Sequence, residues 1–340
     1  MAILKKLYPI LLPLFLTGCY EDFDPHIDTT PVLCLNSLIT AGSPIDVKVT
    51  RSWTYTEVTG ESDHSVTDAT VSIYANGIPV DSGYVAEEGD RIRIHAVSPS
   101  YGEAEAEVTV PVSPRISDTD FSTVVTDLRM QNYQGWGLNA DIWFDIRISM
   151  EFADIRETDD YHRLTYTTFS PKGIMSGEED PELPLRPVHY AHLSGGNFDA
   201  LDPVFYEQVD PFEDMMYGSY YYTFFSDRLY NGEKKTLTFG FSTCFFDLSG
   251  WHGDPNDLEC GWEVTLYSIS ESYYKWLAYI EHDNGIIFND FSYLGMADPI
   301  WSYSNVSTGA GVVAAESSVK VKINIKDFLM KIIDAALAGN

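Results

Sequence analysis

Few residues in this chain have the types and spacing of a metal site. His189 and His192 lie three positions apart, a spacing that would direct both imidazoles at one ion only on a helix. They fall in an irregular segment, so two exposed loop histidines are the preferred interpretation. Residues 254–259 offer oxygen ligands for calcium, yet they lack the ligand spacing and central glycine of an EF-hand loop. The sequence therefore predicts no metal site.

Catalytic motifs are equally sparse. No segment reads Gly-x-Ser-x-Gly, the nucleophile elbow of the α/β-hydrolases. Geometry rather than spacing defines a glycosidase carboxylate pair, and 51 acidic residues make any choice of pair arbitrary. We therefore expect a protein that is not an enzyme, with no catalytic residues and no cofactor. A glycan hydrolase is the weakest alternative.

One cysteine does carry a recognisable chemistry. Residues 1–18 run from Lys5 and Lys6 through an apolar stretch to Thr17-Gly18, which is the anatomy of an export signal. The stretch is too short for a membrane span, which needs roughly 20 apolar residues. Leu16-Thr17-Gly18-Cys19 resembles the bacterial lipobox, so we expect cleavage before Cys19 and fatty acyl chains, palmitate among them, on that residue. The alternative is an ordinary secretory signal and a free protein.

Residues 19–30 are polar and contain proline, which is typical of a flexible tether between an anchor and a folded body. The acids that follow Cys19, namely Glu21, Asp22 and Asp24, also look like the surface-export signal of Bacteroidota lipoproteins. This similarity implies a body at the cell surface, facing the medium from the outer membrane.

Charge limits the partners. Removal of residues 1–18 takes away two lysines and lowers the net charge from −30 to −32. Nucleic-acid binding depends on clustered Lys and Arg that release counterions, and no such cluster is present. We expect no nucleic-acid partner, and we expect membrane contact to come from the lipid.

Three cysteines remain in an oxidising compartment, so at most one pair can form. Cys244 and Cys260 bracket a loop whose closure would stabilise the chain by about 3 kcal/mol, and they are the predicted disulfide. Cys34 lies in an apolar run and is predicted to be a small buried hydrophobe.

Hydrophobic alternation predicts a mostly β chain in two parts. Between residues 31 and 112, short runs alternate with period two, and Asn76-Gly77 separates two of them as a tight hairpin turn would. We expect an immunoglobulin-like β-sandwich here. Pro111 and Pro114 would interrupt any ladder, so a larger antiparallel β domain is placed at residues 113–326.

The second part contains one convincing helix, from Ser270 to Glu281, with Ser270 as its cap. Residues 171–216 show no sustained period and are predicted to form a long excursion, the preferred place for a ligand or partner surface. A short amphipathic helix is expected within residues 327–340. The aromatic run 217–225 offers a candidate stacking platform formed by Tyr217, Tyr220, Tyr222 and Phe224, although alternate rings of a strand are expected to be core.

Several segments together are similar to one family, the Bacteroidota outer-membrane lipoproteins with domain of unknown function 4249. The segments that carry this resemblance, besides the lipobox, are 32–40, 47–52, 68–73, 225–232, 268–277 and 305–313, the last with Gly309 and Gly311. It extends to about Ile325. The resemblance implies an outer-membrane lipoprotein associated with a TonB-dependent transporter, and it supplies no catalytic residues. A structural or adhesive surface protein is the alternative.

Overall fold

A computed structural model describes residues 30–52, 64–81, 83–116, 121–132, 138–153, 158–170, 190–209, 221–251, 258–284 and 303–338. Contacts divide the chain into two units, and the unit formed by Val32–Ser52 and Asp63–Asn340 contains every helix and strand described. The predicted export signal and Cys19 lie outside the described residues.

The N-terminal strands form a β-sandwich. One sheet has the order β4-β3-β5-β6 and packs on β1 and β2. Its strands are β1 (Leu33–Thr40), β2 (Lys48–Arg51), β3 (Thr70–Ala75), β4 (Ile78–Val80), β5 (Arg91–Ser98) and β6 (Gly102–Thr109). Alternate residues of β5 are fully buried, as the period of two predicts. Asn76 and Gly77 have φ of 53° and 81°, which confirms the predicted hairpin turn.

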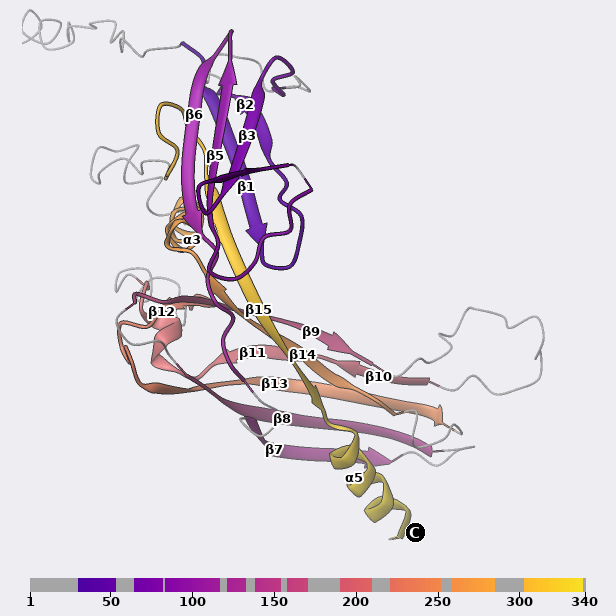
Figure 1. The fold of residues 1–340 in the computed structure, drawn as a ribbon. Coiled ribbons are helices and arrows are strands. Elements are labelled where there is room, and N and C mark those ends of the chain that lie inside the picture. The colour runs from indigo at the N-terminus through magenta and orange to yellow at the C-terminus, as the bar shows by residue number, and fades with distance from the viewer. Residues whose placement is uncertain are drawn as a thin grey trace, which may run out of the picture. The chain divides into compact units, whose positions relative to one another are not determined.

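A late strand completes this sandwich. The first residues of β15 (Val313–Asn324) pair in parallel with β1, from Ser37 beside Val313 to Thr40 beside Glu316. From Glu316 to Asn324, β15 also pairs antiparallel with β14 (Gly261–Ile269), so it runs from one sandwich into the next (Figure 1). Val313 and Ala315 lie in the first core, whereas Val321 and Ile323 lie in the second. The structure therefore adds residues from beyond position 300 to a sandwich that the sequence placed before residue 113.

Two glycines before β15 allow this close approach. A Cβ on Gly309 would come within 2.4 Å of the Leu33 carbonyl oxygen, and one on Gly311 within 2.2 Å of the Leu35 carbonyl oxygen. The backbone of Gly311 also has a φ of 115°, which side chains rarely adopt. Ala310, which lies between the two glycines, hydrogen-bonds to β1, and its N donates to Leu33 O at 3.0 Å.

The second sandwich places a five-stranded sheet against part of a six-stranded one. The five-stranded sheet has the order β10-β13-β8-β7, with β11 also paired to β13; the six-stranded sheet has the order β12-β9-β14-β15-β1-β2. The remaining strands are β7 (Phe121–Asn132), β8 (Leu138–Ala153), β9 (Tyr161–Phe169), β10 (Tyr190–Ser194), β11 (Asn197–Ala200), β12 (Phe224–Ser226) and β13 (Lys234–Trp251). Phe241 of β13 stacks on Trp262 of β14, with centroids 4.6 Å apart.

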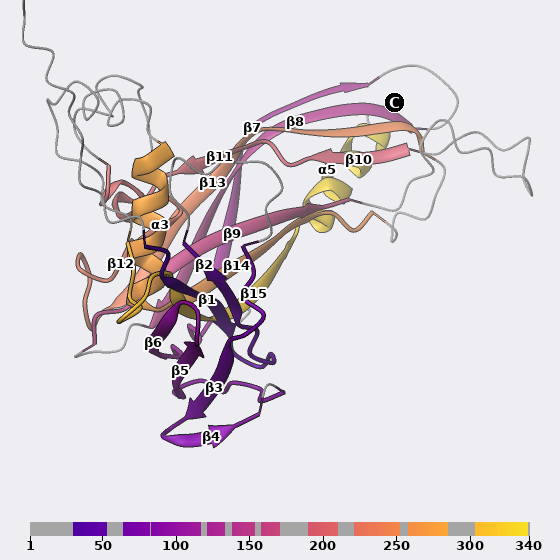
Figure 2. The same cartoon turned by 90° about the horizontal axis from the view of Figure 1, so that it is seen from above.

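Two α-helices are present among the described residues, α3 (Glu271–Asn284) and α5 (Lys326–Ala338). Helix α3 follows β14 and α5 follows β15. Because these two strands run antiparallel, the helices lie at opposite ends of the second sandwich (Figure 2). Ser270 Oγ accepts a hydrogen bond from Tyr273 N at 3.3 Å, which confirms the predicted cap. No helix among the described residues is long and apolar enough to cross a membrane. The prediction of a mostly β chain, with an N-terminal β-sandwich, a larger antiparallel β domain and one or two short helices, is confirmed. The arrangement of the larger domain as a second sandwich was not predicted.

The predicted excursion is structured where it is described. Residues 190–194 and 197–200 form β10 and β11, which pair with β13, and a 3-10 helix, η1 (Pro203–Tyr206), follows. The sequence missed these short strands because their pairing with a distant strand stabilises them, and four or five residues show no clear period.

Candidate functional site

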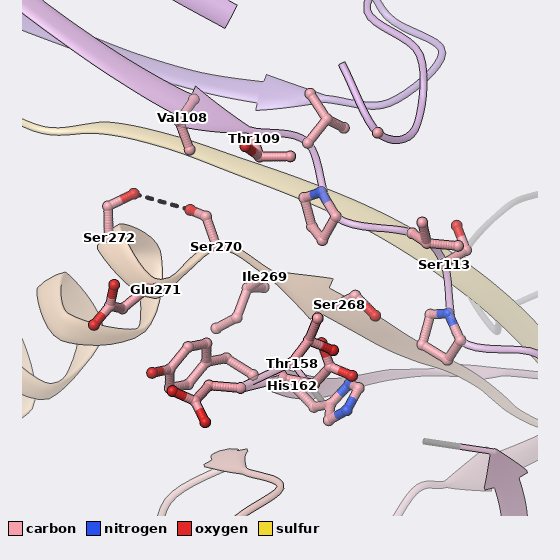
Figure 3. Close-up of a pocket in the computed structure, with 18 of the residues that line it drawn as sticks. Val108, Thr109, Ser113, Thr158, His162, Ser268, Ile269, Ser270, Glu271 and Ser272 are labelled. Carbon is pink, nitrogen blue, oxygen red and sulfur yellow. Dashed lines mark hydrogen bonds between the residues drawn. The ribbon is translucent and has the colours of Figure 1, made fainter. Parts of the chain in front are cut away.

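A cavity of about 1000 Å³ lies where the segment that leaves the first sandwich passes the second. We call it the linker cavity (Figure 3). Its walls are the end of β6 with residues 109–115, the residues that enter β9, and the junction between β14 and α3. The lining side chains of most interest are Glu107, Ser113, Arg115, Thr158, Asp159, Asp160, Tyr161, His162, Ser268, Ser270, Glu271, Ser272 and Tyr303.

The wall at the start of α3 is held by hydrogen bonds within the protein. The hydroxyls of Ser270 and Ser272 lie 2.9 Å apart, and Figure 3 marks this bond. Ser272 Oγ donates to the Val313 carbonyl oxygen at 2.9 Å, while Ser270 Oγ accepts from Ala315 N at 3.0 Å. These hydrogen bonds hold the start of α3 against β15 and so fix this wall of the cavity.

In contrast to these two serines, His162, the second residue of β9, is a buried polar residue with poorly satisfied hydrogen bonds. Its side chain is only 4% exposed, and its ring lies 5.1 Å from Phe152 and 5.6 Å from Phe225 between centroids. Among the described residues, neither ring nitrogen makes a hydrogen bond of normal geometry, although the main chain of Tyr267 lies close enough to affect the ring. An unpaired buried polar group costs about 1–3 kcal/mol of stability, so the burial of His162 lowers the unfolding free energy.

The same burial fixes the protonation state of the ring. Burial lowers the pKa of His162 to about 4, against smaller opposing effects of the Asp160 charge and the main chain of Tyr267. The ring is therefore neutral at pH 7, with one acceptor and one donor nitrogen.

The charged side chains around the cavity are mostly acidic. Those that line it are Glu107, Asp159, Asp160 and Glu271, against Arg115. Glu271 pairs with Lys275 at 2.8 Å, and Glu107 lies 3.7 Å from Arg91. Asp159 and Asp160 line the cavity next to His162 in sequence, and Thr158 Oγ1 donates a hydrogen bond to Asp160 Oδ1 at 3.1 Å.

Asp227 is a third acid in this region. Its side chain is 2% exposed, and its Oδ2 has no hydrogen bond among the described residues. Its main-chain nitrogen donates to the Asp160 carbonyl oxygen at 2.9 Å. Burial, together with the charges of Asp160 and Asp159, raises the pKa of the Asp227 carboxyl. The carboxyls of Asp159, Asp160 and Asp227 are thus close enough to influence one another.

Two rings of the aromatic platform predicted from the sequence are buried. Tyr222 and Phe224 are each 4% exposed and belong to the small core beneath α3, where Phe224 meets Tyr274 edge to face at 5.6 Å. The prediction that these two rings offer a ligand surface is therefore wrong, because α3 covers the strand that carries them. Tyr217 and Tyr220 lie outside the described residues.

Cys244 and Cys260 are free, buried thiols in place of the predicted disulfide. Cys244 lies in β13 and Cys260 directly precedes β14, so they come from different sheets. Burial raises the pKa of each thiol to about 12, and both serve as small core residues. Cys34 is a free thiol too, and it is only partly buried.

No group of three or more His, Cys, Asp or Glu side chains within the described ranges could hold a metal ion. His192 is exposed on β10, and His189 lies outside those ranges. His162 is not among the residues that the sequence singled out. The available signal was alternation, because His162 and Leu164 face the same core.

A second, smaller hollow lies beside α3 on the outer face of β1 and β15. Its volume is about 390 Å³, and Tyr273 and Trp276 form its helix side. Leu38, at its floor, is 45% exposed. Its mostly apolar lining does not indicate a particular ligand.

A family model described as domain of unknown function (DUF4249) matches residues 20–322. The chain belongs to this family. The DUF4249 match includes every wall of the linker cavity and ends just before the last residues of β15, so α5 lies outside it. No curated protein and no solved structure matches the chain.

Proposed function

We propose that this DUF4249 protein is a non-enzymatic lipoprotein of the outer membrane that captures or presents a ligand for a TonB-dependent transporter. The observation that carries the proposal is the export signal that ends in Leu16-Thr17-Gly18-Cys19, ahead of a body that belongs to this family. The lipid on Cys19 would hold the body at the cell surface. The linker cavity is the place where a ligand would bind, since its volume is in the usual range for small-molecule sites.

The lipid anchor is tested by labelling cells with radioactive palmitate. The wild-type chain should carry label, and Cys19→Ser should carry none, because the serine hydroxyl replaces the thiol that is acylated. Cys34→Ser is the matched control and should be labelled like the wild type. Label on Cys19→Ser would contradict the assignment of the anchor.

The partner is tested by affinity purification of the full chain, with Cys19 intact, from membranes in mild detergent. A TonB-dependent barrel should remain bound after a salt wash and be identified by mass spectrometry. Cells without the tagged chain provide the background. An eluate without a barrel would overturn the accessory role and favour the adhesive alternative, which predicts binding to cells or matrix polymers with no transport defect on deletion.

A further inference from the structure

We propose that three partly exposed tyrosines of the second sandwich, Tyr166, Tyr206 and Tyr221, bind a neutral glycan whose sugar rings stack on their aromatic faces. We call these side chains, together with Leu201, the tyrosine patch. The inference goes beyond the proposed function, which places a ligand in the linker cavity, because none of these four residues lines that cavity.

The patch exists because one edge of the second sandwich is partly open. Strand β9 pairs with β14 from Tyr161 to Phe169, whereas β12 pairs with its other side only from Tyr161 to Arg163. Leu164 and Tyr166 point to the same face of β9, since they are two positions apart. Leu164 is 1% exposed, but Tyr166, beyond the end of β12, is 37% exposed. Tyr166 therefore presents an aromatic ring to solvent from a core-facing position.

Phe198 of β11 holds two of the tyrosines in place. It stacks on Tyr166, with centroids 5.4 Å apart and ring planes 9° from parallel. Its centroid also lies 5.5 Å from that of Tyr221. Because Phe198 itself belongs to the second core, both tyrosines rest on a rigid base and lose little freedom when a ligand binds.

The 3-10 helix η1 carries the third tyrosine. Phe205 of η1 is buried and meets Phe198 edge to face at 5.7 Å. Its neighbour Tyr206 is 40% exposed, and the Tyr206 hydroxyl donates to the Ala200 carbonyl oxygen at 2.8 Å. Tyr222 N donates to Phe205 O at 2.8 Å, so the residue before it, Tyr221, lies beside η1.

Polar groups accompany these rings. Burial, together with the nearby Tyr166, Asp199 and Tyr206, raises the pKa of Tyr221, so the three hydroxyls and this carboxylate are close enough to influence one another. Asp199 Oδ1 accepts a hydrogen bond from Ser242 Oγ at 2.9 Å, and a carboxylate has lone pairs for further donors.

This combination of groups matches the chemistry of a sugar. One face of a pyranose ring presents C–H bonds with a small positive charge, and the face of an aromatic ring is negative. Sugar hydroxyls can donate to Asp199, and tyrosine hydroxyls both donate and accept. The chain has a net charge of −30, which repels anionic ligands. A neutral glycan therefore fits better than a charged one.

The size of the patch favours a glycan over a protein partner. A specific protein interface buries about 800 Å² on each partner, and a fully buried aromatic side chain contributes about 150–250 Å². The four side chains of the patch are each less than half exposed, so together they offer well below the area of such an interface.

The test is isothermal titration calorimetry with the purified full chain. We expect saturable binding of cellohexaose or maltohexaose, which are neutral, and none of hexagalacturonate, which has the same length but a carboxylate on each sugar. Tyr206→Ala and Tyr166→Leu, which remove a ring, should each weaken binding by at least about tenfold. Tyr206→Phe keeps the ring and should stay within about threefold of the wild type. Leu229→Ala, an exposed position outside the patch, is the control and should bind like the wild type.

Thermal melts of the same samples separate a lost ligand contact from a lost fold. Tyr206→Ala changes an exposed side chain, so it should melt within a few degrees of the wild type. Failure of the wild type to bind either neutral hexasaccharide at millimolar concentration would overturn the inference. Undiminished binding by folded Tyr206→Ala and Tyr166→Leu would also overturn it, because the glycan would then bind elsewhere.

The inference and the proposed function can fail separately. Recovery of a barrel by a chain that binds no glycan would overturn only the glycan site, and glycan binding by a chain that never recovers a barrel would overturn only the accessory role. If Tyr206→Ala binds no glycan less tightly but no longer recovers the barrel, the tyrosine patch is a protein interface and the inference is wrong.

Discussion

Two buried polar side chains, Asp90 in the first sandwich and His162 in the second, are treated in opposite ways by their surroundings. Asp90 is 7% exposed and accepts hydrogen bonds from Asn76 Nδ2 and Tyr84 Oη, both at 2.7 Å, and from Glu87 N at 2.9 Å. Although burial alone would raise the pKa of Asp90, these donors lower it. His162 has no comparable partner among the described residues.

This difference separates a buried polar group whose hydrogen bonds are satisfied from one whose hydrogen bonds are not. Asp90 ties the Asn76-Gly77 hairpin to the turn before β5 and has its acceptor capacity occupied. Both ring nitrogens of His162 are buried, and neither makes a hydrogen bond of normal geometry among the described residues. Both residues are buried to a similar degree, so their hydrogen-bond partners distinguish the two roles.

The largest expected effect that sharpens this contrast is a dependence of stability on pH. The pKa of His162 is about 4 in the folded chain, against an ordinary value of 6.5, so between these pH values the unfolded chain binds more protons. The wild type should therefore lose about 3 kcal/mol of unfolding free energy as the pH falls from 6.5 to 4, at about 1.4 kcal/mol per pKa unit.

His162→Phe is the reference for this measurement, because both chains share the carboxyls whose raised pKa values act in the opposite direction, such as Glu316 and Asp227. Urea unfolding of both chains at pH 7, 5.5 and 4 gives the difference. A difference that does not change with pH would show that the ring titrates normally in the folded state.

The next effect concerns Asp90. Asp90→Ala would remove the acceptor of three hydrogen bonds, from Asn76 Nδ2, Tyr84 Oη and Glu87 N, so we expect a loss of about 2 kcal/mol in unfolding free energy. Urea denaturation at pH 7 measures it, with Asp334→Ala on α5 as a surface control that should change stability by less than about 0.5 kcal/mol. A loss as small as that of the control would break the contrast, since Asp90 would then be no more structural than an exposed acid.

The smallest expected effect is a gain in unfolding free energy. At pH 7, His162→Phe removes a buried unpaired polar group while an aromatic ring remains between Phe152 and Phe225, so it should raise the unfolding free energy by about 1 kcal/mol. Residues that serve function commonly lower the stability of the fold. A loss of more than 1 kcal/mol in urea denaturation would mean that His162 serves the fold.

Much of the fold was predictable because local pattern and tertiary structure agree. The alternation in β5, β8 and the end of β15 predicted their buried faces, and Ser270 predicted the start of α3. The first residues of β15 escaped prediction because alanine, glutamate and serine carry no strong strand preference. Their burial comes from β1, which is nearly 280 positions away along the chain.

The candidate site was less accessible from sequence than the fold. The aromatic residues that looked like a binding surface are core, because α3 covers Tyr222 and Phe224. The histidine that lines the cavity looked like one more residue near the start of a strand. Burial and hydrogen-bond satisfaction are properties of three-dimensional neighbours, and spacing along the chain does not report them.

By itself, the sequence of this protein determined the strand and helix periodicity and the tight turn at Asn76-Gly77, because each depends on a few consecutive residues, and for the same reason it predicts lipid attachment at Cys19. Only the tertiary structure decided that β15 belongs to both sandwiches, that Cys244 and Cys260 lie apart in different sheets, and that His162 is buried between Phe152 and Phe225. The physical reason is that these features arise from contacts between segments far apart in the chain, and such contacts leave no periodic signal in either segment.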